Sequence, residues 1–259
     1  MAEIKKNPNS TFSSSQRNID ESWYKSTRTH RVWFACGCAT VLIALAKSAF
    51  IFAAAAPPLT PFIWIQLLLA ASLGYVLADL GSGIYHWAID NYGGAQTPVF
   101  GPQIESFLYH HQHPAEIAKC ETAGILCTVA EVVTVVVTPI NILSDHPIFL
   151  AFVAVFTGCV MFSLKFHAWA HTPRRKLPPL VTALQNAGVL LKWSEHTKHH
   201  RPPFNSHFCT VSGIWNRVLD EFNILAAFEV ALFRATGVRP RSWSEPDSGG
   251  TEASPNSKE

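Results

Sequence analysis

The chain has 259 residues, of which 48% are hydrophobic and only 15% are charged, and its mean hydropathy of +0.15 exceeds that expected of a soluble domain of this length. The formal net charge is only +2, and no basic tract is interleaved with aromatic residues, so nucleic acid is excluded as an expected partner. The six cysteines form no CxxC pair and indicate neither a disulfide framework nor a zinc ribbon.

Polar segments flank the apolar part of the chain. Residues 1–26 are rich in Ser, Thr and Asn, so we expect them to be disordered. Their serine content also fits a transit peptide in part, although acidic residues are present. The tail at 242–259 is similarly polar and turn-forming, and the sequence therefore predicts one membrane domain at 27–241 between two disordered ends.

Four apolar stretches are long enough to cross a bilayer, which needs about 20 helical residues. Short turns of Pro and small polar residues join the first stretch to the second and the third to the fourth, so we expect two helical hairpins. Pro139 is expected to kink the third stretch or to end it early. The stretches lie at 32–56, 61–85, 122–143 and 147–166.

A soluble protein with two buried hairpins is the alternative, and Lys47, Asp79 and Glu131 inside the apolar stretches favour it. Of 20 Lys and Arg residues, however, all except Lys47 lie in the N-terminal segment, in the loop at 86–121 or after residue 164. If four helices alternate across the bilayer, these basic segments all face one side, as the positive-inside rule requires. The sequence therefore predicts an all-α integral membrane protein with four transmembrane helices.

Two further segments lie outside the four predicted spans, and one acidic residue, Asp79, lies within the second span. The segments at 173–191 and 224–237 have apolar faces but cannot cross the bilayer, so we expect them to lie along the membrane interface as amphipathic helices. Asp79 has two interpretations, because intramembrane acids tend to be functional but can also pair with backbone groups or with a basic residue.

Twelve histidines are many for this length, and most of them occur in pairs or triplets at helical spacing. Side chains three or four residues apart lie on one face of a helix, where they can bind one metal ion. An even number of predicted spans separates each cluster from the next, so all of them reach the same side of the membrane. The candidate metal ligands and catalytic residues are His86, His110, His111, His167, His171, His196, His199 and His200, with Asp90 as a further ligand or as a carboxylate that orients one.

Eight imidazoles exceed what one ion can use, so we expect two metal ions, each with three or four imidazoles, in a histidine-rich cap. The absence of an HExxH motif disfavours a zinc peptidase. Removing hydrogen from an unactivated methylene of an acyl chain requires a strong oxidant, which two iron ions with O2 as co-substrate supply. The remaining histidines, at 30, 113, 146 and 207, are interpreted as solvated or supporting residues.

Several motifs together resemble the plant fatty acid desaturase 4 family, whose relatives include the animal plasmanylethanolamine desaturase. The resemblance runs from about residue 26 to residue 246 and rests on DLGSGIYHWAIDNYG, HHQHP, FHAWAH, LPPLVTALQ, HTKHHRPP, FCTVSGIWNRVLDE and GVRPRSWSEP. It implies a di-iron acyl-lipid desaturase that places a trans double bond at carbon 3 of palmitate on phosphatidylglycerol. It also implies that the same eight histidines, with Asp90, bind the iron.

This resemblance implies a chloroplast membrane enzyme with its metal site on the stromal side, and the endoplasmic reticulum is the alternative location. No flavin or nicotinamide fingerprint is present, so we expect electrons from a ferredoxin or cytochrome-type donor. Arg174, Arg175 and Lys176 are candidates for docking that donor or for contacting anionic lipid. The alternative functions are a lipid hydroxylase or plasmanyl-lipid desaturase with the same site and, from another class, a histidine-rich metal transporter, which would place ionisable groups at mid-membrane.

Overall fold

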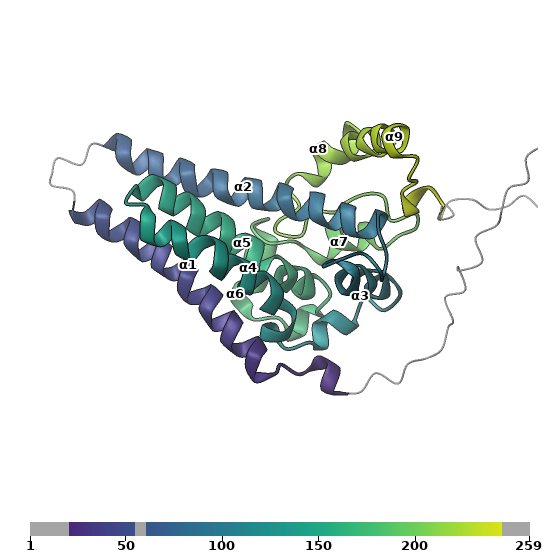
Figure 1. Cartoon of the computed structure of the whole chain (residues 1–259), viewed down its shortest axis with the longest axis horizontal. Coiled ribbons are helices and arrows are strands. Elements are labelled where there is room, and N and C mark those ends of the chain that lie inside the picture. Colours follow the sequence, from purple (N-terminus) through teal and green to yellow (C-terminus); the bar gives the residue numbers. More distant parts are fainter. Residues whose placement is uncertain (1–20, 55–60, 245–259) are drawn as a thin grey trace, which may run out of the picture.

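The computed structural model describes residues 21–54 and 61–244, without the side chains of 61–63, and this part of the chain contains helices and no strands (Figure 1). Its four long helices are α1 (Arg28–Ala54), α2 (Pro61–Asn91), α4 (Thr122–Leu143) and α5 (Pro147–Ala170). Each is long and apolar enough to cross a membrane. The prediction of an all-α membrane protein with four transmembrane helices is confirmed.

The two expected hairpins share one bundle. Helix α1 packs against α4 and α5, and α2 packs along α5 (Figure 1). Their common core is made of small and β-branched side chains, among them Ala44, Ala130 and Val133. Small residues let helix backbones approach closely, which matters in a membrane because lipid gives no hydrophobic force between helices.

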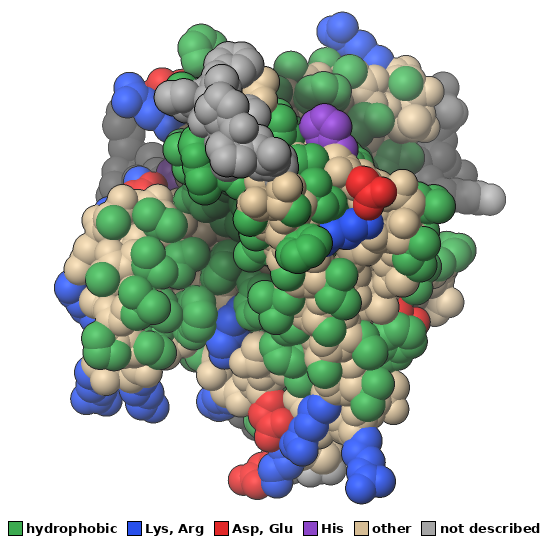
Figure 2. Space-filling view, turned by 90° about the vertical axis from the view of Figure 1, so that its left-hand side faces the viewer, with side chains coloured by type: hydrophobic (Ala, Val, Ile, Leu, Met, Phe, Trp, Pro, Cys, Tyr) green, Lys and Arg blue, Asp and Glu red, His purple; other side chains and the backbone are tan. Residues whose placement is uncertain are grey.

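Large apolar side chains face outward from the bundle, with Phe50 72% and Leu68 67% exposed. Figure 2, which views the left-hand side of Figure 1, shows hydrophobic side chains over much of that face and Lys and Arg mainly toward its edges. Such a surface suits lipid rather than water and excludes the soluble alternative. The charge of Lys47 has local partners, since its Nζ lies 2.7 Å from Asp145 and donates to the carbonyl oxygen of Asn141 at 2.9 Å.

Asp79 is fully buried and serves the fold. Its carboxylate accepts hydrogen bonds from the backbone N–H groups of Ser212, Gly213 and Trp215, at 2.7, 3.0 and 3.2 Å. Of the two interpretations of this acid, the structure therefore shows pairing with the backbone. These bonds fasten the segment around residue 212 to α2.

Two spans extend further than their apolar patterns predict. Helix α2 ends at Asn91 rather than at residue 85, and α5 ends at Ala170 rather than at residue 166. Hydropathy misses these turns because their polar side chains find partners inside the protein. Helix α4 continues through Pro139 to Leu143, which excludes an early end. One missing hydrogen bond is tolerated where neighbouring helices surround a span.

Shorter helices form a cap at one end of the spans. They are α3 (Gly101–Gln112), α6 (Pro179–Asn186), α7 (Trp193–His199), α8 (Asn216–Glu221) and α9 (Ile224–Thr236). Four 3-10 turns accompany them, η1 (Glu21–Tyr24), η2 (Glu116–Lys119), η3 (Arg174–Lys176) and η4 (Arg241–Trp243). Helix α3 lies where the sequence analysis expected a loop, because its twelve residues carry only a weak apolar pattern.

Most of both predicted disordered ends, 1–20 and 245–259, lies outside the described residues. The rest of these segments is ordered. The Tyr24 hydroxyl donates to the Glu116 carboxylate, and the backbone N–H of Ser26 donates to Glu121 at 2.9 Å. At the other end, η4 contacts α2, so the folded part of the chain extends past residue 241.

Candidate metal centre

The eight candidate histidines and Asp90 converge from α2, α3, α5 and α7, with one histidine just past the end of α5 and another just past the end of α7. Their metal-binding atoms form two groups, and within each group these atoms lie within 4.8 Å of one another. We call them the five-histidine group and the aspartate group. The first consists of His110, His167, His171, His196 and His200, and the second of His86, Asp90, His111 and His199.

Helical geometry decides which neighbours in sequence share a group. Residues four apart lie on one helix face, whereas adjacent residues point about 100° apart. Every pair of ligands spaced i and i+4 accordingly stays in one group, and every adjacent pair is divided between the groups. The pairs that stay together are 86 with 90, 167 with 171 and 196 with 200, and the divided adjacent ones are 110 with 111 and 199 with 200. His196 and His199, which are three residues apart, are also divided, so the expectation that this spacing serves one metal is wrong for them. The sequence predicted three or four imidazoles for each metal. The structure instead places five imidazoles in one group and three imidazoles with one carboxylate in the other.

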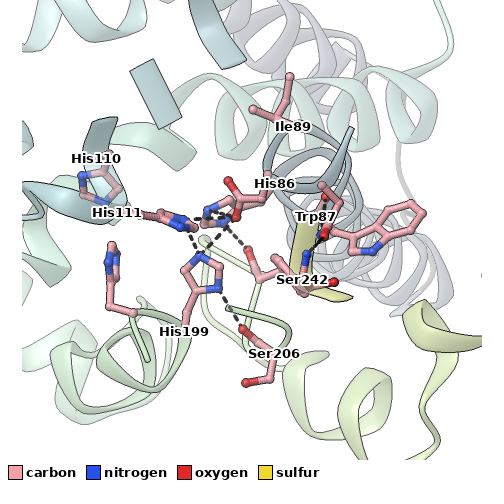
Figure 3. Close-up of polar contacts among 12 residues, drawn as sticks. His86, Trp87, Ile89, His110, His111, His199, Ser206 and Ser242 are labelled. Atoms are coloured by element: carbon pink, nitrogen blue, oxygen red, sulfur yellow. Dashed lines mark hydrogen bonds and ion pairs between the residues drawn. The ribbon is translucent and has the colours of Figure 1, made fainter. Parts of the chain in front are cut away.

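In the aspartate group, three imidazoles surround one carboxylate oxygen. The Oδ2 of Asp90 lies 3.2 Å from Nε2 of His86 and 3.3 Å from Nε2 of both His111 and His199. The Nε2 atoms of His111 and His199 are 3.1 Å apart. Figure 3 shows the side chains of His86, His111 and His199 pointing toward one another. Their atoms are therefore close enough to share one ion.

Backbone carbonyls orient two of these rings. Nδ1 of His86 donates to the carbonyl oxygen of Phe208, and Nδ1 of His199 donates to that of Ser206, each at 2.9 Å (Figure 3). A carbonyl can only accept, so Nδ1 carries a proton in both rings, and Nε2 is the nitrogen that faces Asp90 and can bind a metal. Bare nitrogens and a carboxylate oxygen repel one another at these distances. One added proton would satisfy one contact, whereas a metal ion satisfies all of them, so the group fits a metal.

The five-histidine group contains no acid. The Nε2 atoms of His110 and His171 lie 3.0 Å apart, and those of His196 and His200 lie 3.1 Å apart. A metal–nitrogen bond of about 2.1 Å places two ligands at right angles about 3.0 Å apart, so these separations suit imidazoles on one ion. His167 is 1% exposed, and neither of its ring nitrogens has a hydrogen-bond partner among the described residues. An unpartnered buried nitrogen costs free energy, which a bound ion offsets.

Burial in the cap keeps imidazoles of the five-histidine group unprotonated. Burial, followed by the effect of neighbouring imidazoles, lowers the pKa of His171 to about 4 and that of His110 to about 2. Burial, followed by the nearby imidazoles, also holds the pKa of His196 and His200 below the usual range. These rings are therefore neutral at physiological pH, which is the form that binds metals.

The sequence patterns did not predict two residues that support the site, Arg241 and Glu229. Arg241 closes the end of α2 beside the metal centre, because its guanidinium donates to the carbonyl oxygens of Asp90, at 2.7 Å, and of Gly93. The only signal for it was its position in the GVRPRSWSEP motif. The buried carboxylate of Glu229 accepts from the indole N–H groups of Trp87 and Trp243, at 2.9 and 2.8 Å. An acid within the otherwise apolar stretch of α9 was the signal for this contact.

The other four histidines join neither group. His113 is exposed and stacks on Tyr109, with ring centroids 4.3 Å apart, and Nδ1 of His207 lies 3.0 Å from Oδ2 of Asp220. His30 and His146 accept backbone N–H groups at the starts of α1 and α5. The interpretation of these four as solvated or supporting residues agrees with their positions.

Comparison with known proteins adds independent evidence. Residues 75–243, which begin in α2, end in η4 and include both ligand groups, match the lipid desaturase domain family. The chain belongs to this family. It is 48% identical over 228 residues to fatty acid desaturase 4-like 1, chloroplastic, of Arabidopsis thaliana, covering 88% of this chain and 75% of the relative.

Further relatives agree with this assignment. Fatty acid desaturase 4, chloroplastic, of the same plant is 48% identical over 222 residues, covering 86% of this chain and 67% of the relative. Plasmanylethanolamine desaturase of Myxococcus xanthus is 32% identical over 188 residues, covering 70% of this chain and 66% of the relative. No solved structure matches the chain.

The predicted resemblance and enzyme class are confirmed: the chain is an acyl-lipid desaturase, an oxidoreductase whose substrate is a membrane lipid. The histidine groups are compatible with a metal site in this desaturase. The four spans and the chloroplastic names of the plant relatives support a chloroplast membrane as its location.

Proposed function

We propose that this desaturase binds two iron ions, one in each ligand group, and uses O2 and external electrons to place a trans double bond at carbon 3 of a palmitoyl chain of phosphatidylglycerol. The observation that carries the proposal is the pair of largely buried ligand groups, in each of which the possible metal-binding atoms lie within 4.8 Å of one another. Imidazole and carboxylate donors suit iron. The choice of lipid and of bond position is the one that the resemblance to the fatty acid desaturase 4 family implies.

In the proposed reaction the residues of the cap would bind the iron ions, orient the ligands and limit the access of water. When bound, two iron ions with O2 supply the oxidising power that an unactivated C–H bond requires. Asp90 gives one iron a negatively charged ligand, and the carbonyl groups of Ser206 and Phe208 hold two imidazoles in the tautomer that binds metal. Burial of the ligands, with His196 and His199 at 0% exposure, limits the access of water to the oxidising site.

The proposed orientation places the cap on the stromal side, where the basic segments of the chain lie. The chain would then receive electrons from a stromal carrier of the ferredoxin type or from a cytochrome-type donor.

Lipid analysis tests the proposal. The full chain, His199→Ala and His113→Ala are expressed with an electron donor in a host that lacks the product, and every lipid class is examined by mass spectrometry. We expect a trans-3-hexadecenoyl phosphatidylglycerol with the natural chain and with His113→Ala, because His113 joins neither ligand group, and none with His199→Ala.

Other products would change the assignment. A hydroxylated acyl chain would identify a hydroxylase, and a vinyl ether would identify a plasmanyl-lipid desaturase like the more distant relatives. If the new lipid persists in His199→Ala, or if the purified active protein contains no iron, the proposed site is wrong.

A further inference from the structure

A pocket of about 410 Å³ lies directly beside the five-histidine group. Its walls come from the end of α5, η3, α6 and the start of α7. His171 belongs both to the pocket wall and to the five-histidine group. A molecule bound in this pocket would therefore lie next to the metal centre.

The charged side chains in the pocket wall are both positive. They belong to Arg174 and Lys192, and no acidic residue lines the pocket. Neither cation forms a side-chain hydrogen bond or ion pair with another residue in the described part of the chain. Thr172, Asn186 and Ser194 add hydroxyl and amide groups to the same wall. Two free cations with neutral hydrogen-bonding groups select a small anion.

The pocket lies at the level of lipid headgroups. The membrane-spanning helix α5 ends at Ala170, one residue before His171. Large apolar side chains flank the pocket and point outward, with Leu180 70%, Trp193 63% and Val189 42% exposed. Exposed aromatic and aliphatic side chains beside basic residues are typical of the membrane interface. The anion is therefore expected to come from the bilayer.

We propose that this pocket binds the phosphate of the substrate lipid through Arg174 and Lys192. The inference rests on the proposed function and extends it to the headgroup. In a phospholipid, seven bonds separate carbon 3 of the acyl chain on the middle glycerol carbon from the phosphorus atom, which is roughly 8 Å at about 1.2 Å per bond. Desaturation at carbon 3 thus requires a phosphate site close to the metals. The pocket meets this requirement, because His171 belongs both to its wall and to the five-histidine group.

The shape of the pocket favours a small group over a protein carrier. A carrier complex of ordinary size needs about 800 Å² of surface from each partner. Arg174 and Lys192 instead line one concavity large enough for a phosphoglycerol group.

The test compares two double variants that remove the same charge. Arg174→Gln with Lys192→Gln alters the pocket, whereas Arg175→Gln with Lys176→Gln alters cations of the same turn that do not line it. The purified full-length protein is equilibrated with vesicles of phosphatidylglycerol and phosphatidylcholine, and the retained lipids are counted by native mass spectrometry. Loss of two charged hydrogen bonds should lower the retained ratio of phosphatidylglycerol to phosphatidylcholine by about 10-fold or more.

In steady-state assays, KM for phosphatidylglycerol should rise by a similar factor in the pocket variant, with kcat within about 2-fold of the natural chain, because a headgroup contact acts on binding. With the electron donor at saturating concentration, the control variant should match the natural chain in the ratio of retained lipids and in KM for phosphatidylglycerol. If the double pocket variant does not fold, Lys192→Gln alone should give a smaller change in the same direction.

Each other outcome has a defined meaning. An equal loss of phosphatidylglycerol in both variants would indicate general attraction to anionic lipid and overturn the proposal. A change in KM for the electron donor, with lipid retention unchanged, would assign the pocket to a carrier and overturn it. Binding of inorganic phosphate in the pocket, with phosphatidylglycerol retention unchanged in the pocket variant, would identify a free-phosphate site and also overturn it. Selective retention by a chain that forms no desaturated lipid would support the pocket and contradict the proposed function.

Discussion

The two ligand groups use the same side chain but are held in different ways. In the aspartate group, backbone carbonyls of Ser206 and Phe208 orient two rings, and Asp90 supplies negative charge. In the five-histidine group there is no acid, and Nδ1 of His110 and of His196 has no hydrogen-bond partner among the described residues. Packing of α3, α5 and α7 therefore positions these rings.

The two groups would therefore hold a metal ion by different means. One group depends on a carboxylate and on a short backbone segment, residues 206–208, whereas the other depends on the number of its imidazoles. Changes to the segment or to the charge should loosen one iron and leave the other. A negative ligand also binds a cation more strongly in a buried site than a neutral ligand does. The predictions below test this separation.

The largest effect is expected from two adjacent histidines that serve different groups. His110→Ala and His111→Ala should each lower desaturase activity by at least about 100-fold, because each removes a metal ligand. His110→Ala leaves four ligands in its group, but His111→Ala leaves three, so the second variant should lose more iron. Iron is counted by inductively coupled plasma mass spectrometry. Loss of both irons in both variants would contradict two separately held sites.

Two buried acids on α2 should give opposite kinds of effect. Asp90→Asn removes the charge beside the imidazoles and should weaken iron binding by about 10- to 100-fold while the protein stays folded. Asp79→Asn should instead lower the free energy of unfolding by about 2–4 kcal/mol, because an amide cannot accept from all three N–H groups that the carboxylate binds. Metal titration and chemical denaturation in detergent measure the two effects. Equal iron loss in both variants would show that Asp90 has no special role.

Two glycines on α2 provide a smaller and more selective test. A Cβ at Gly83 would overlap the Sγ of Cys209, whereas a Cβ at Gly81 would meet nothing within 4 Å. Gly83→Ala should push the segment at 206–209 away from α2, displacing the carbonyls that orient two imidazoles. We expect iron binding in the aspartate group to weaken by about 10-fold and stability to fall by about 1–3 kcal/mol.

Gly81→Ala is the matched control and should behave like the natural chain in metal titration and thermal unfolding. The five-histidine group should keep its iron in both glycine variants. If Gly83→Ala weakens both irons equally, the backbone segment does not act on the aspartate group alone.

The smallest effect concerns the metal-free protein at acid pH. The pKa of His171 is about 4 in the folded state and near 6.5 in an unfolded chain, so the unfolded state binds more protons between these values. Stability should therefore fall as pH drops from about 6.5 toward 4, by at most about 1.4 kcal/mol per pH unit for each such histidine. Thermal unfolding at pH 7 and pH 5 measures it. His171→Gln should reduce this slope, and an unchanged slope would contradict the assignment.

The sequence by itself determined the four spans and the convergence of the candidate histidines at one end of them, because hydropathy, charge and helical spacing are local properties. Spacing also implies that ligands four residues apart act together and that adjacent ones diverge. Helix α3 and the last turns of α2 and α5 were missed, because their polar faces are satisfied only by the folded cap.

Only the tertiary structure decided which of these local pairs come together in one ligand group. His110 meets His171 across 61 residues, and His199 meets His111 across 88. The contacts of Arg241 and Glu229 and the cationic pocket beside His171 likewise join distant parts of the chain. Helix geometry operates over a few residues and orients each side chain, whereas the packing of α3, α5 and α7 against α2 brings the helix faces together.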